Sequence, residues 1–575
     1  MAKKPIYKTQ NKTLQQEELY NTLKQSHSEI LAHIYSNRNL TAQDLDLSQK
    51  LVHFKSLKNA TKAAAILFNF IQANKKICIV SDYDADGATA CSIGLLGLQM
   101  FNANVSYIVP NRFVHGYGLT PTVIEEAIDK IKPDLLVTVD NGISSVEGVD
   151  YANSKNIPVL ITDHHLVGEV LPNALCIVNP NLPDCTFESK NLAGCGVIFY
   201  ILCALRQHYI DCGIYNTKNA PNVFSLLDLV AIGTIADVVP LDINNRIMIS
   251  LGLKYIQNNK TRPGILALIE TCKKQHHTLN SSDISFYVAP QINAAGRLED
   301  MSIGIQCLTT NNNEDAKLLA KRLHKINIER KSIENKMKEI ALCNQTNTEN
   351  QNTIQNNTHV KTYYHPSYHE GVVGILASRL KDLHYLPTIV FADSKDETLL
   401  KGSGRSIQQI HLRDALDYVY KKSNNIIVKF GGHSAAAGLT IYKNKLQEFS
   451  SLFNEAVKYY ANNKDLNNIK IIDLELPQEY ITIENAKIIT SQIWGQGLPP
   501  PIFKGKFKIL SQHILSGSHL KVRLEIEQKE IEGIWFFKKT PLDQEQQELV
   551  YSLSINEFNG TQKIQLLIEG QLDLK

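Results

Sequence analysis

The chain has 575 residues, of which 43% are hydrophobic and 20% charged, and its formal net charge is +3. These values are ordinary for a globular protein of about three to four domains, and they exclude a chain that is basic over its whole surface. The sequence contains no apolar run of about 18 residues and no apolar stretch like that of a signal peptide near its start. We therefore expect a cytoplasmic protein without a membrane span.

The first half of the chain predicts a helical start followed by an α/β region. Residues 10–70 look helical and mostly polar. From 76 to about 180, short apolar runs alternate with segments of helical pattern, which favours βαβ units and a parallel sheet. Residues from 195 to about 270 again look helical. The apolar runs are I-C-I-V (77–80), V-S-Y-I-V (105–109), L-L-V-T-V (135–139) and I-P-V-L-I (157–161).

The second half begins with a long polar helical pattern over 311–342. The Asn/Gln/Thr tract that follows, 344–358, cannot supply a core, so we predict a flexible loop there between two lobes. A second α/β region spans about 360–460. Residues 501–575 alternate as strands do, in L-K-V-R-L-E-I for example, and predict a small β-barrel.

Acidic and imidazole side chains follow three of the predicted strands of the first α/β region. In a parallel sheet the carboxyl ends of the strands form one ligand-binding edge, so these side chains should meet. Oxygen and imidazole ligands favour Mn²⁺ or Mg²⁺, and the ten cysteines form no C-x-x-C pair that would suit a thiolate zinc site. The residues are Asp82, Asp84 and Asp86 after the first run, Asp140 after the third, and Asp163, His164 and His165 after the fourth, with Asp237 at the end of a helical pattern.

A calcium loop is the alternative interpretation of D-Y-D-A-D-G (82–87). A helix-loop-helix calcium site requires a glutamate six residues after the glycine, and position 93 is Ile93. The Asp-His-His triplet, taken alone, is more typical of a surface turn than of a ligand set. The combination after three strands favours instead a pair of divalent ions for hydrolysis at phosphorus.

Four segments together resemble the signature motifs of the DHH superfamily of phosphoesterases. They are V-S-D-Y-D-A-D-G, V-T-V-D-N-G, I-T-D-H-H and G-T-I-A-D-V-V-P-L. Four further segments are similar to its branch of bacterial single-stranded-DNA exonucleases: P-Q-I-N-A-A-G-R (290–297), H-E-G-V-V-G-I-L-A-S-R-L (369–380), K-G-S-G-R-S-I (401–407) and F-G-G-H-S-A-A-A-G (430–438). The resemblance covers roughly residues 70–575.

This resemblance implies a two-lobed α/β enzyme followed by an oligonucleotide-binding barrel. The implied domains are an N-terminal helical region (1–70), a DHH catalytic domain with a parallel sheet (71–300), a connecting helix and loop (301–358), a DHH-associated substrate-binding domain (359–465) and the OB-like barrel (466–575). The implied activity is 5′→3′ degradation of single-stranded DNA to mononucleotides in recombination and repair.

The resemblance also assigns roles to the acids and imidazoles. It implies two Mn²⁺ or Mg²⁺ ions, with Asp140 between them. One ion would be held by Asp86, Asp140, His164 and Asp237, and the other by Asp82 and Asp84 with Asp140 as the shared ligand. Asp163 would orient an imidazole, and His165 would face the scissile phosphate as a donor or acid.

A second set of residues is expected to hold DNA. Each of these segments has a structural alternative: a packing turn for the glycine-rich segment 431–438, a solvated basic loop for 401–407, and an ion pair for an arginine on a helix. We expect a helix after residues 431–438, whose N–H groups would favour a phosphate. Gln291 departs from an arginine-like position in the superfamily pattern, which puts one contact in doubt. The expected DNA contacts are Arg297, Arg379, Ser403, Arg405, Gly431, Gly432 and His433.

The predicted barrel mixes cations and aromatic rings, as a single-strand-binding groove does. For most of the aromatic residues a place in the barrel core is the alternative. The residues are Lys504, Lys506, Lys508, Lys521, Arg523, Phe503, Phe507, Trp535, Phe536 and Phe537.

Two other functions stay open. A related phosphodiesterase could act on short oligonucleotides or cyclic dinucleotides, and a replication scaffold could have the same fold without catalysis. The superfamily resemblance favours the exonuclease, acting as a monomer with a single-strand-binding protein and a DNA helicase as partners.

Overall fold

The computed structural model describes residues 5–9, 12–111, 116, 118–343, 359–462, 464–515, 517–558 and 560–572. The chain divides into a large unit, Gln10–Asn327 with Ile472–Lys575, and a small unit, Met1–Thr9 with Ile328–Ile471. The predicted loop 344–358 lies outside the described residues. Among the described residues, no helix combines the length and the hydropathy that crossing a membrane requires.

The large unit contains a five-stranded sheet in which every pair is parallel and the strand order is β3-β2-β4-β5-β6. The four predicted runs each form a strand. The chain adds β3 on one side of β2 and then crosses to add β4 on the other side, so the order in which strands are added reverses at β2. Ligands usually bind at such a reversal point. The strands are β2 (Lys76–Ser81), β3 (Asn104–Ile108), β4 (Leu135–Val139), β5 (Val159–Thr162) and β6 (Cys176–Val178).

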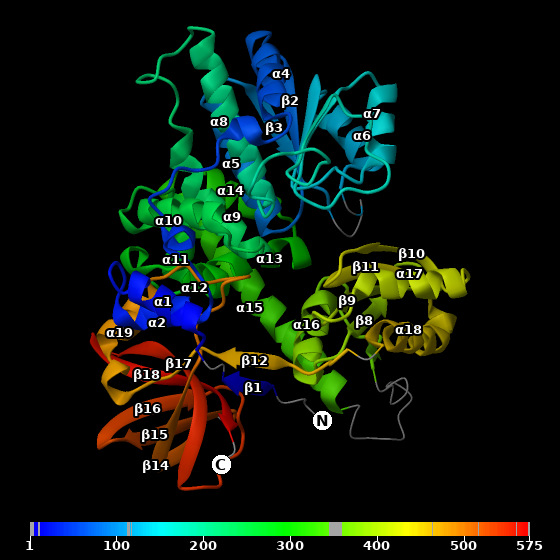
Figure 1. Cartoon of the computed structure of the whole chain (residues 1–575). Helices are drawn as coiled ribbons and strands as arrows, with labels where there is room; N and C mark the ends of the chain where they lie inside the picture. Colours follow the sequence, from blue (N-terminus) through cyan, green and yellow to red (C-terminus); the bar gives the residue numbers. More distant parts are fainter. Residues whose placement is uncertain are drawn as a thin grey trace. The chain divides into compact units, whose positions relative to one another are not determined.

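Helices cover both faces of this sheet, which explains why its strands are continuously apolar (Figure 1). Ile77 and Ile79 of β2 point into one core and Cys78 and Val80 into the other, as alternation along a strand requires. One face packs on α4 (Ala60–Gln72), α5 (Ala85–Gln99) and α8 (Gly194–Asp211), and the other on α6 (Pro121–Lys130) and α7 (Val146–Ser154).

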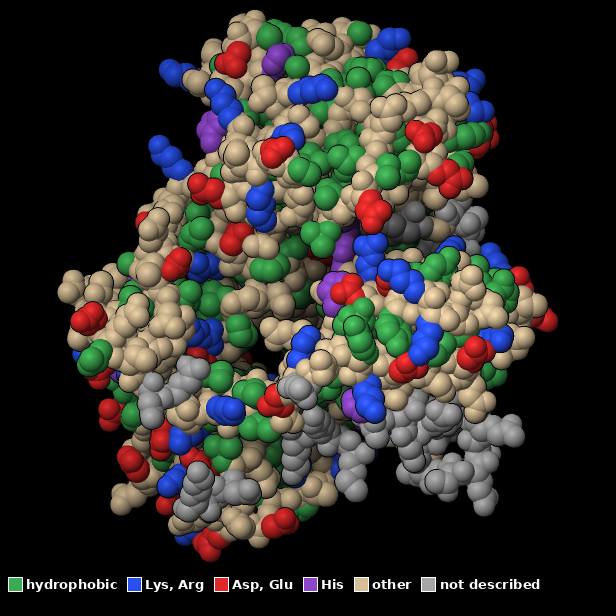
Figure 2. All heavy atoms as spheres, turned by 45° about the vertical axis from the view of Figure 1, so that its right-hand side comes forward, with side chains coloured by type: hydrophobic (Ala, Val, Ile, Leu, Met, Phe, Trp, Pro, Cys, Tyr) green, Lys and Arg blue, Asp and Glu red, His purple; other side chains and the backbone are tan. Residues whose placement is uncertain are grey.

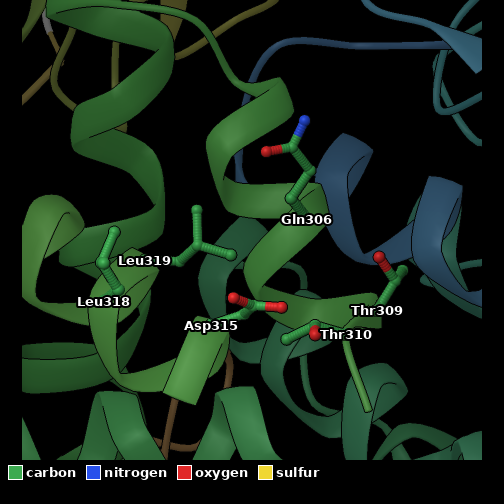
Figure 3. Close-up of a pocket in the computed structure, with 6 residues that line it drawn as sticks. All are labelled: Gln306, Thr309, Thr310, Asp315, Leu318 and Leu319. Atoms are coloured by element: carbon green, nitrogen blue, oxygen red, sulfur yellow. The ribbon is translucent and has the colours of Figure 1, made fainter. Parts of the chain in front are cut away.

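The region predicted to be helical, 195 to about 270, contains α8, α9 (Leu227–Asp237), α10 (Ile243–Gln257) and α11 (Pro263–Thr271). The further helices that follow it are α12 (Ser281–Asp283), α13 (Ala289–Leu298), α14 (Ser302–Thr309) and the long α15 (Asn313–Cys343). A pocket of about 440 Å³ lies between the end of α14 and the start of α15, with Asp315 and Leu319 among its lining residues (Figure 3). None of the side chains with a predicted role lines that pocket.

The C-terminal part of the large unit is a closed five-stranded barrel, in which β14 pairs with β17 and β16 with β18. Its core shares one cluster with α1 (Leu14–Leu23), α2 (Glu29–Asn37) and α19 (Ile483–Thr490). Arg38, which follows α2, pairs with Asp473 at 2.7 Å, so the N-terminal helices are fastened to the barrel. The strands are β14 (Phe503–Leu515), β15 (His519–Ile526), β16 (Lys529–Trp535), β17 (Gln546–Phe558) and β18 (Thr561–Leu572), preceded by the short β13 (Leu474–Glu475).

The small unit contains a five-stranded mixed sheet of order β10-β11-β9-β8-β7. Its strands are β7 (Lys361–Tyr364), β8 (Thr388–Asp393), β9 (Leu399–Arg405), β10 (Ile427–Gly432) and β11 (Ala436–Tyr442). Its helices are α16 (Val373–His384), α17 (Leu412–Lys422) and α18 (Leu446–Ala461). A separate ladder joins β1 (Ile6–Thr9) to β12 (Ile469–Ile472).

Candidate metal centre

The loop after β2 orients its first two aspartates through its own backbone. Oδ1 of Asp82 accepts the N–H of Tyr83 at 2.7 Å. Asp84 is the N-cap of α5, and its Oδ1 accepts the N–H of Gly87 at 2.9 Å. In each carboxylate the hydrogen bond from the loop's own backbone fixes the orientation of the side chain.

The third aspartate of this loop, Asp86, is held by the start of α8. The N–H of Gly194 donates to its Oδ2 at 2.6 Å, and the N–H of Cys195 donates to its Oδ1 at 3.0 Å. The N-cap residue of α8 makes no side-chain hydrogen bond to the first N–H groups of the helix. The carboxylate of Asp86, from α5, accepts from two of them instead. The positive end of the helix dipole also favours the charge of Asp86.

Asp140 sits at the reversal point of the sheet in an unusual backbone conformation. Its φ is +61°, which residues other than glycine rarely adopt. Its N–H donates to the carbonyl of Thr162 at 3.1 Å, and the side chain of Asn141 donates to the carbonyl of Val80 at 3.1 Å. A Cβ on Gly194 would lie 2.5 Å from the Cβ of Asp140, so only glycine fits beside this carboxylate.

Asp163 orients the two histidines after β5. Its Oδ1 accepts the N–H of His164 at 2.7 Å and that of His165 at 3.0 Å, and it lies 2.7 Å from Nδ1 of His165. Its Oδ2 accepts the N–H of Ile143 at 2.9 Å. The ring of His164 faces elsewhere, with Nε2 at 3.1 Å from Asp140 and 3.6 Å from Asp237.

The acids and imidazoles from four segments thus come together. Possible ligand atoms lie within 4.8 Å of one another in three overlapping sets. Because the sets share Asp140 and His164, they form one continuous cluster. The sets are Asp86, His164 and Asp237; Asp82, Asp84 and Asp140; and Asp140, His164 and His165.

Crowding of negative charge shapes the electrostatics of this cluster. Burial and the neighbouring aspartates raise the pKa of Asp140 and that of Asp237 well above the usual range. Burial and Asp84 raise the pKa of Asp86 to about 6. Like charges at these distances oppose one another unless protons or cations neutralise them.

His165 is placed in the opposite environment. Burial acts to lower its pKa, but the hydrogen bond and charge of Asp163 outweigh burial and raise the pKa of His165 to about 9. For Asp163, burial acts to raise the pKa, and the contacts with His165 outweigh it and lower the pKa to about 2. The pair therefore favours an imidazolium beside a carboxylate.

The donor set fits a hard divalent cation. Its atoms are carboxylate oxygens and imidazole nitrogens, the ligands suited to Mn²⁺ and Mg²⁺. Oδ1 of Asp140 is buried and accepts no hydrogen bond from the part of the chain that is described. Cysteine is absent from the candidate ligand sets that the described residues form.

Three contributions to this centre were not predicted from the sequence. Two are the backbone N–H groups of Gly194 and Cys195, and the third is Asn293 of α13, whose Oδ1 accepts the N–H of Ala85 at the start of α5 at 3.0 Å. The glycines of G-C-G (194–196) at the start of an apolar helix were the available signal for the first two.

The predicted DNA contacts on β9 and α16 lie in the small unit. Nη1 of Arg405 donates to Oγ of Ser403 at 3.1 Å, on a strand rather than in a loop. Nε of Arg379 donates to Glu334 at 3.1 Å, while 60% of the arginine side chain is exposed. Arg379 therefore has the ion pair that was its structural alternative, and much of it still faces solvent.

The expectation of a helix after residues 431–438 is wrong. This segment forms the hairpin between β10 and β11, in which the N–H of His433 donates to the carbonyl of Ala436 at 2.8 Å. Gly432 has a φ of +140°, a conformation suited to glycine in a turn. Small residues permit both a tight hairpin and a strand-to-helix turn, which is why their pattern did not separate the two.

Arg297 and Gln291 both lie on α13, with different surroundings. Gln291 is 1% exposed, and its side chain donates to the carbonyls of Leu268 and Tyr287 at 3.2 and 3.1 Å. Its departure from the superfamily pattern is therefore accommodated by packing. Arg297 is in the last turn of the helix that carries Asn293.

The cations of the barrel are largely paired with acids. Lys504 lies 3.0 Å from Glu475 and Lys521 lies 3.0 Å from Glu532, and Arg523 pairs with Glu530. Mixed charges also cover the face of the molecule in Figure 2, where Lys and Arg lie among Asp and Glu. Exposed ion pairs of this kind leave little uncompensated positive charge for a phosphate.

The aromatic residues of the barrel differ in burial, and Trp535 is partly buried against the barrel core. Phe503 and Phe507 fill its core, as the alternative interpretation held. Phe536 and Phe537 follow the end of β16, and their exposed fractions are 49% and 76%. Only the second pair has the exposure that base stacking requires.

Comparisons with known proteins agree with this architecture. The sequence matches the DHH family N-terminal domain over residues 76–234, the DHHA1 domain over 357–459 and the RecJ OB domain over 472–570. It is 42% identical to the single-stranded-DNA-specific exonuclease RecJ of Escherichia coli over 555 residues, covering 94% of this chain and 95% of that protein. It is 33% identical to the Bacillus subtilis protein of the same name, covering 89% of this chain and 63% of that protein.

A solved structure supports the same relationship. The crystal structure of RecJ from Thermus thermophilus in complex with Mn²⁺ has a TM-score of 0.80 and 25% sequence identity, covering 99% of this chain and 79% of that one. The identity to the Escherichia coli protein over nearly the full length of both chains shows the family. This chain therefore belongs to the RecJ family.

Proposed function

We propose that this chain is a Mn²⁺- or Mg²⁺-dependent exonuclease that degrades single-stranded DNA from the 5′ end to mononucleotides. The observation that carries the proposal is the cluster in which Asp86, His164 and Asp237 adjoin Asp82, Asp84 and Asp140. The relatives named as single-stranded-DNA-specific exonucleases support the substrate.

Two ions would occupy this cluster. Asp86, Asp140, His164 and Asp237 would hold one, and Asp82 and Asp84 the other, with Asp140 shared. When bound, such a pair activates a water nucleophile and stabilises the charge of an in-line displacement at phosphorus. The protein side of the reaction is to hold these carboxylates oriented and largely shielded from water, and the bound cations would neutralise their charge.

His165 has a separate role in the proposed reaction. Asp163 holds its imidazole at 2.7 Å and favours its protonated form, as the raised pKa of His165 indicates. We assign His165 to donating a proton or a hydrogen bond to the scissile phosphate. Removing Asp163 would cost both the orientation and the charge of that imidazole.

Contacts with phosphates and base faces would make the enzyme indifferent to sequence. Arg297 in the large unit and Ser403, Arg405, Gly431, Gly432 and His433 in the small unit are the proposed phosphate contacts, with Arg379 as a further one. Phe536 and Phe537 of the barrel are proposed to stack on bases. A long polymer is the substrate that would use such contacts, whereas a cyclic dinucleotide would not need the barrel.

The deciding experiment measures release of nucleotides from 5′- and 3′-labelled single- and double-stranded DNA, with Mn²⁺ and with chelator. We expect Mn²⁺-dependent release of 5′ mononucleotides from single strands. Preferential hydrolysis of a cyclic dinucleotide would instead assign a small-substrate phosphodiesterase, and no hydrolysis of either would assign a scaffold.

We propose action in the cytoplasm, as a monomer, during recombination and repair. A helicase and a single-strand-binding protein would supply the strand, and pull-down with single-strand-binding protein at physiological salt would test that partner.

A further inference from the structure

The segment that follows β6 contains two asparagines with no role in the reaction described above. Residues 179–181 read N-P-N, and Asn179 is fully buried. A buried amide requires hydrogen-bond partners, since burying it without them is strongly unfavourable. The identity of those partners indicates what the segment does.

Both amides donate to the histidine loop. Nδ2 of Asn181 donates to the carbonyl of His164 at 2.6 Å, and Nδ2 of Asn179 donates to the carbonyl of His165 at 2.8 Å. The backbone N–H of Asn181 donates to Oδ1 of Asn179 at 2.7 Å, which fixes the side chain of Asn179 against the backbone of Asn181. We call Asn179 and Asn181 the asparagine clamp.

The clamp completes the backbone hydrogen bonds of the two histidines. Their N–H groups donate to Asp163, and their carbonyls accept from the clamp. The backbone of His164 and His165 is therefore held from both sides, whereas the side chain of the next residue, Leu166, is 64% exposed.

We propose that Asn179 and Asn181 are positioning residues for the metal-dependent reaction. They hold the histidine backbone so that the ring of His164 faces Asp140 and Asp237. This inference rests on the proposed function, because it takes His164 as a metal ligand. Partners that orient metal ligands typically contribute about 10–100-fold to metal affinity.

The chemistry of the clamp requires an amide. A carbonyl oxygen accepts from N–H, so an aspartate at 181 would place a carboxylate oxygen against the carbonyl of His164 without a donor. Asn181→Asp keeps the size of the side chain and removes the donor, whereas Asn181→Ala removes both. If the clamp positions His164, the two variants should both lose Mn²⁺ affinity.

The experiment measures Mn²⁺ binding to the full chain by the electron paramagnetic resonance of free Mn²⁺, together with steady-state nuclease kinetics. Asn181→Ala and Asn181→Asp should each weaken Mn²⁺ binding about 10–100-fold. In saturating Mn²⁺ both should lower kcat and leave the KM for single-stranded DNA unchanged. Asn173→Ala is the matched control, since Asn173 is exposed and its backbone carbonyl, which accepts from Asn153, is retained in alanine.

Melting temperatures and circular dichroism accompany both variants. If Asn181→Ala does not fold, the isosteric Asn181→Asp decides, and wild-type Mn²⁺ affinity in a folded variant overturns the clamp. Unchanged Mn²⁺ affinity with a raised KM for DNA also overturns it. If the wild-type chain binds no Mn²⁺, the metal centre and the proposed function fail. If the wild type binds Mn²⁺ but no more tightly than the variants do, only the asparagine clamp fails.

Discussion

The metal centre of the large unit and the predicted DNA contacts of the small unit are built in different ways. In the metal centre, buried carboxylates are held by groups from other segments, as Asp86 is by the N–H groups of Gly194 and Cys195. On β9, Arg405 contacts its own near neighbours Ser403 and Gly404. The contacts that hold Asp86 are distant in sequence, whereas these contacts of Arg405 are local.

This difference follows from the cost of burying charge. A buried charge without compensation is strongly destabilising, so the fold must supply donors and geometry in advance. An arginine that is partly in water keeps part of its hydration and needs less support, and exposed ion pairs contribute about 0–1 kcal/mol. We therefore expect changes in the metal centre to affect turnover and metal binding, and changes on β9 to affect DNA binding.

Asp140→Ala should have the largest effect. Asp140 belongs to two of the three ligand sets, so its loss would disturb the whole cluster. We expect kcat to fall at least about 1,000-fold, equivalent to about 4 kcal/mol, in saturating Mn²⁺. Asp150→Ala, at an exposed position on α7, is the control in the same unit. A near-normal rate in Asp140→Ala would exclude its role as the shared ligand.

Gly194→Ala should have the next largest effect. The new Cβ would lie 2.5 Å from the Cβ of Asp140 and must displace that carboxylate or the start of α8. We expect Mn²⁺ affinity to fall about 10–100-fold, measured by calorimetric titration. Gly168→Ala is the control, because the nearest atom to its added Cβ is 3.8 Å away. Equal affinity in both variants would show that the centre tolerates movement.

Arg405→Ala should act on binding and not on the chemical step. We expect the KM for single-stranded DNA to rise about tenfold, or about 1.4 kcal/mol, with kcat nearly unchanged. Arg405→Lys should restore only part of the affinity for single-stranded DNA, since lysine lacks the planar fork that binds a phosphate through two N–H groups. Arg413→Ala, exposed on α17, is the control. A fall in kcat alone would place Arg405 with the metal centre instead.

Asp237→Asn should have a smaller effect, which is on the pH dependence of the stability of the metal-free chain. Burial and Asp86 raise the pKa of Asp237, so the folded state binds its proton more tightly than the unfolded state. Its contribution to stability is present at low pH and is lost as the pH rises above about 4 towards the raised pKa. The metal-free wild type should therefore lose more stability than the variant between about pH 5 and pH 7.

Melting temperatures in chelator at these two pH values measure that difference, which we expect to be a few degrees. Added Mn²⁺ should remove the pH dependence from the wild type, because the ion neutralises the carboxylates. Parallel curves for the wild type and Asp237→Asn would mean that this carboxylate titrates normally.

The sequence predicted that the acids and imidazoles meet, but it predicted less of the surroundings of the proposed DNA contacts. Asp82, Asp140 and His164 follow strands that proved parallel and adjacent, so strand ends alone brought them together. The N–H groups of Gly194 and Cys195 were not predicted, because a backbone donor has no side-chain signature in the sequence. The same is true of the space that Gly194 leaves for Asp140.

The side-chain contacts between neighbouring strands of the barrel and of the small unit depend on the register of those strands. A local sequence pattern does not reveal that register. Lys521 looked like a phosphate contact until its pairing with Glu532 on the neighbouring strand was known. The hairpin at Gly432 and His433 was mistaken for the start of a helix because small residues suit both. Aromatic residues of the same barrel, such as Phe507 and Phe537, differ in exposure only once the barrel closes.

The most direct test of the central claim is anomalous diffraction at the manganese edge from crystals of the full chain grown with Mn²⁺. We predict two peaks inside the cluster, one beside Asp86, His164 and Asp237 and one beside Asp82 and Asp84, with Asp140 contacting both. Peaks elsewhere, or none at saturating Mn²⁺, would contradict the account.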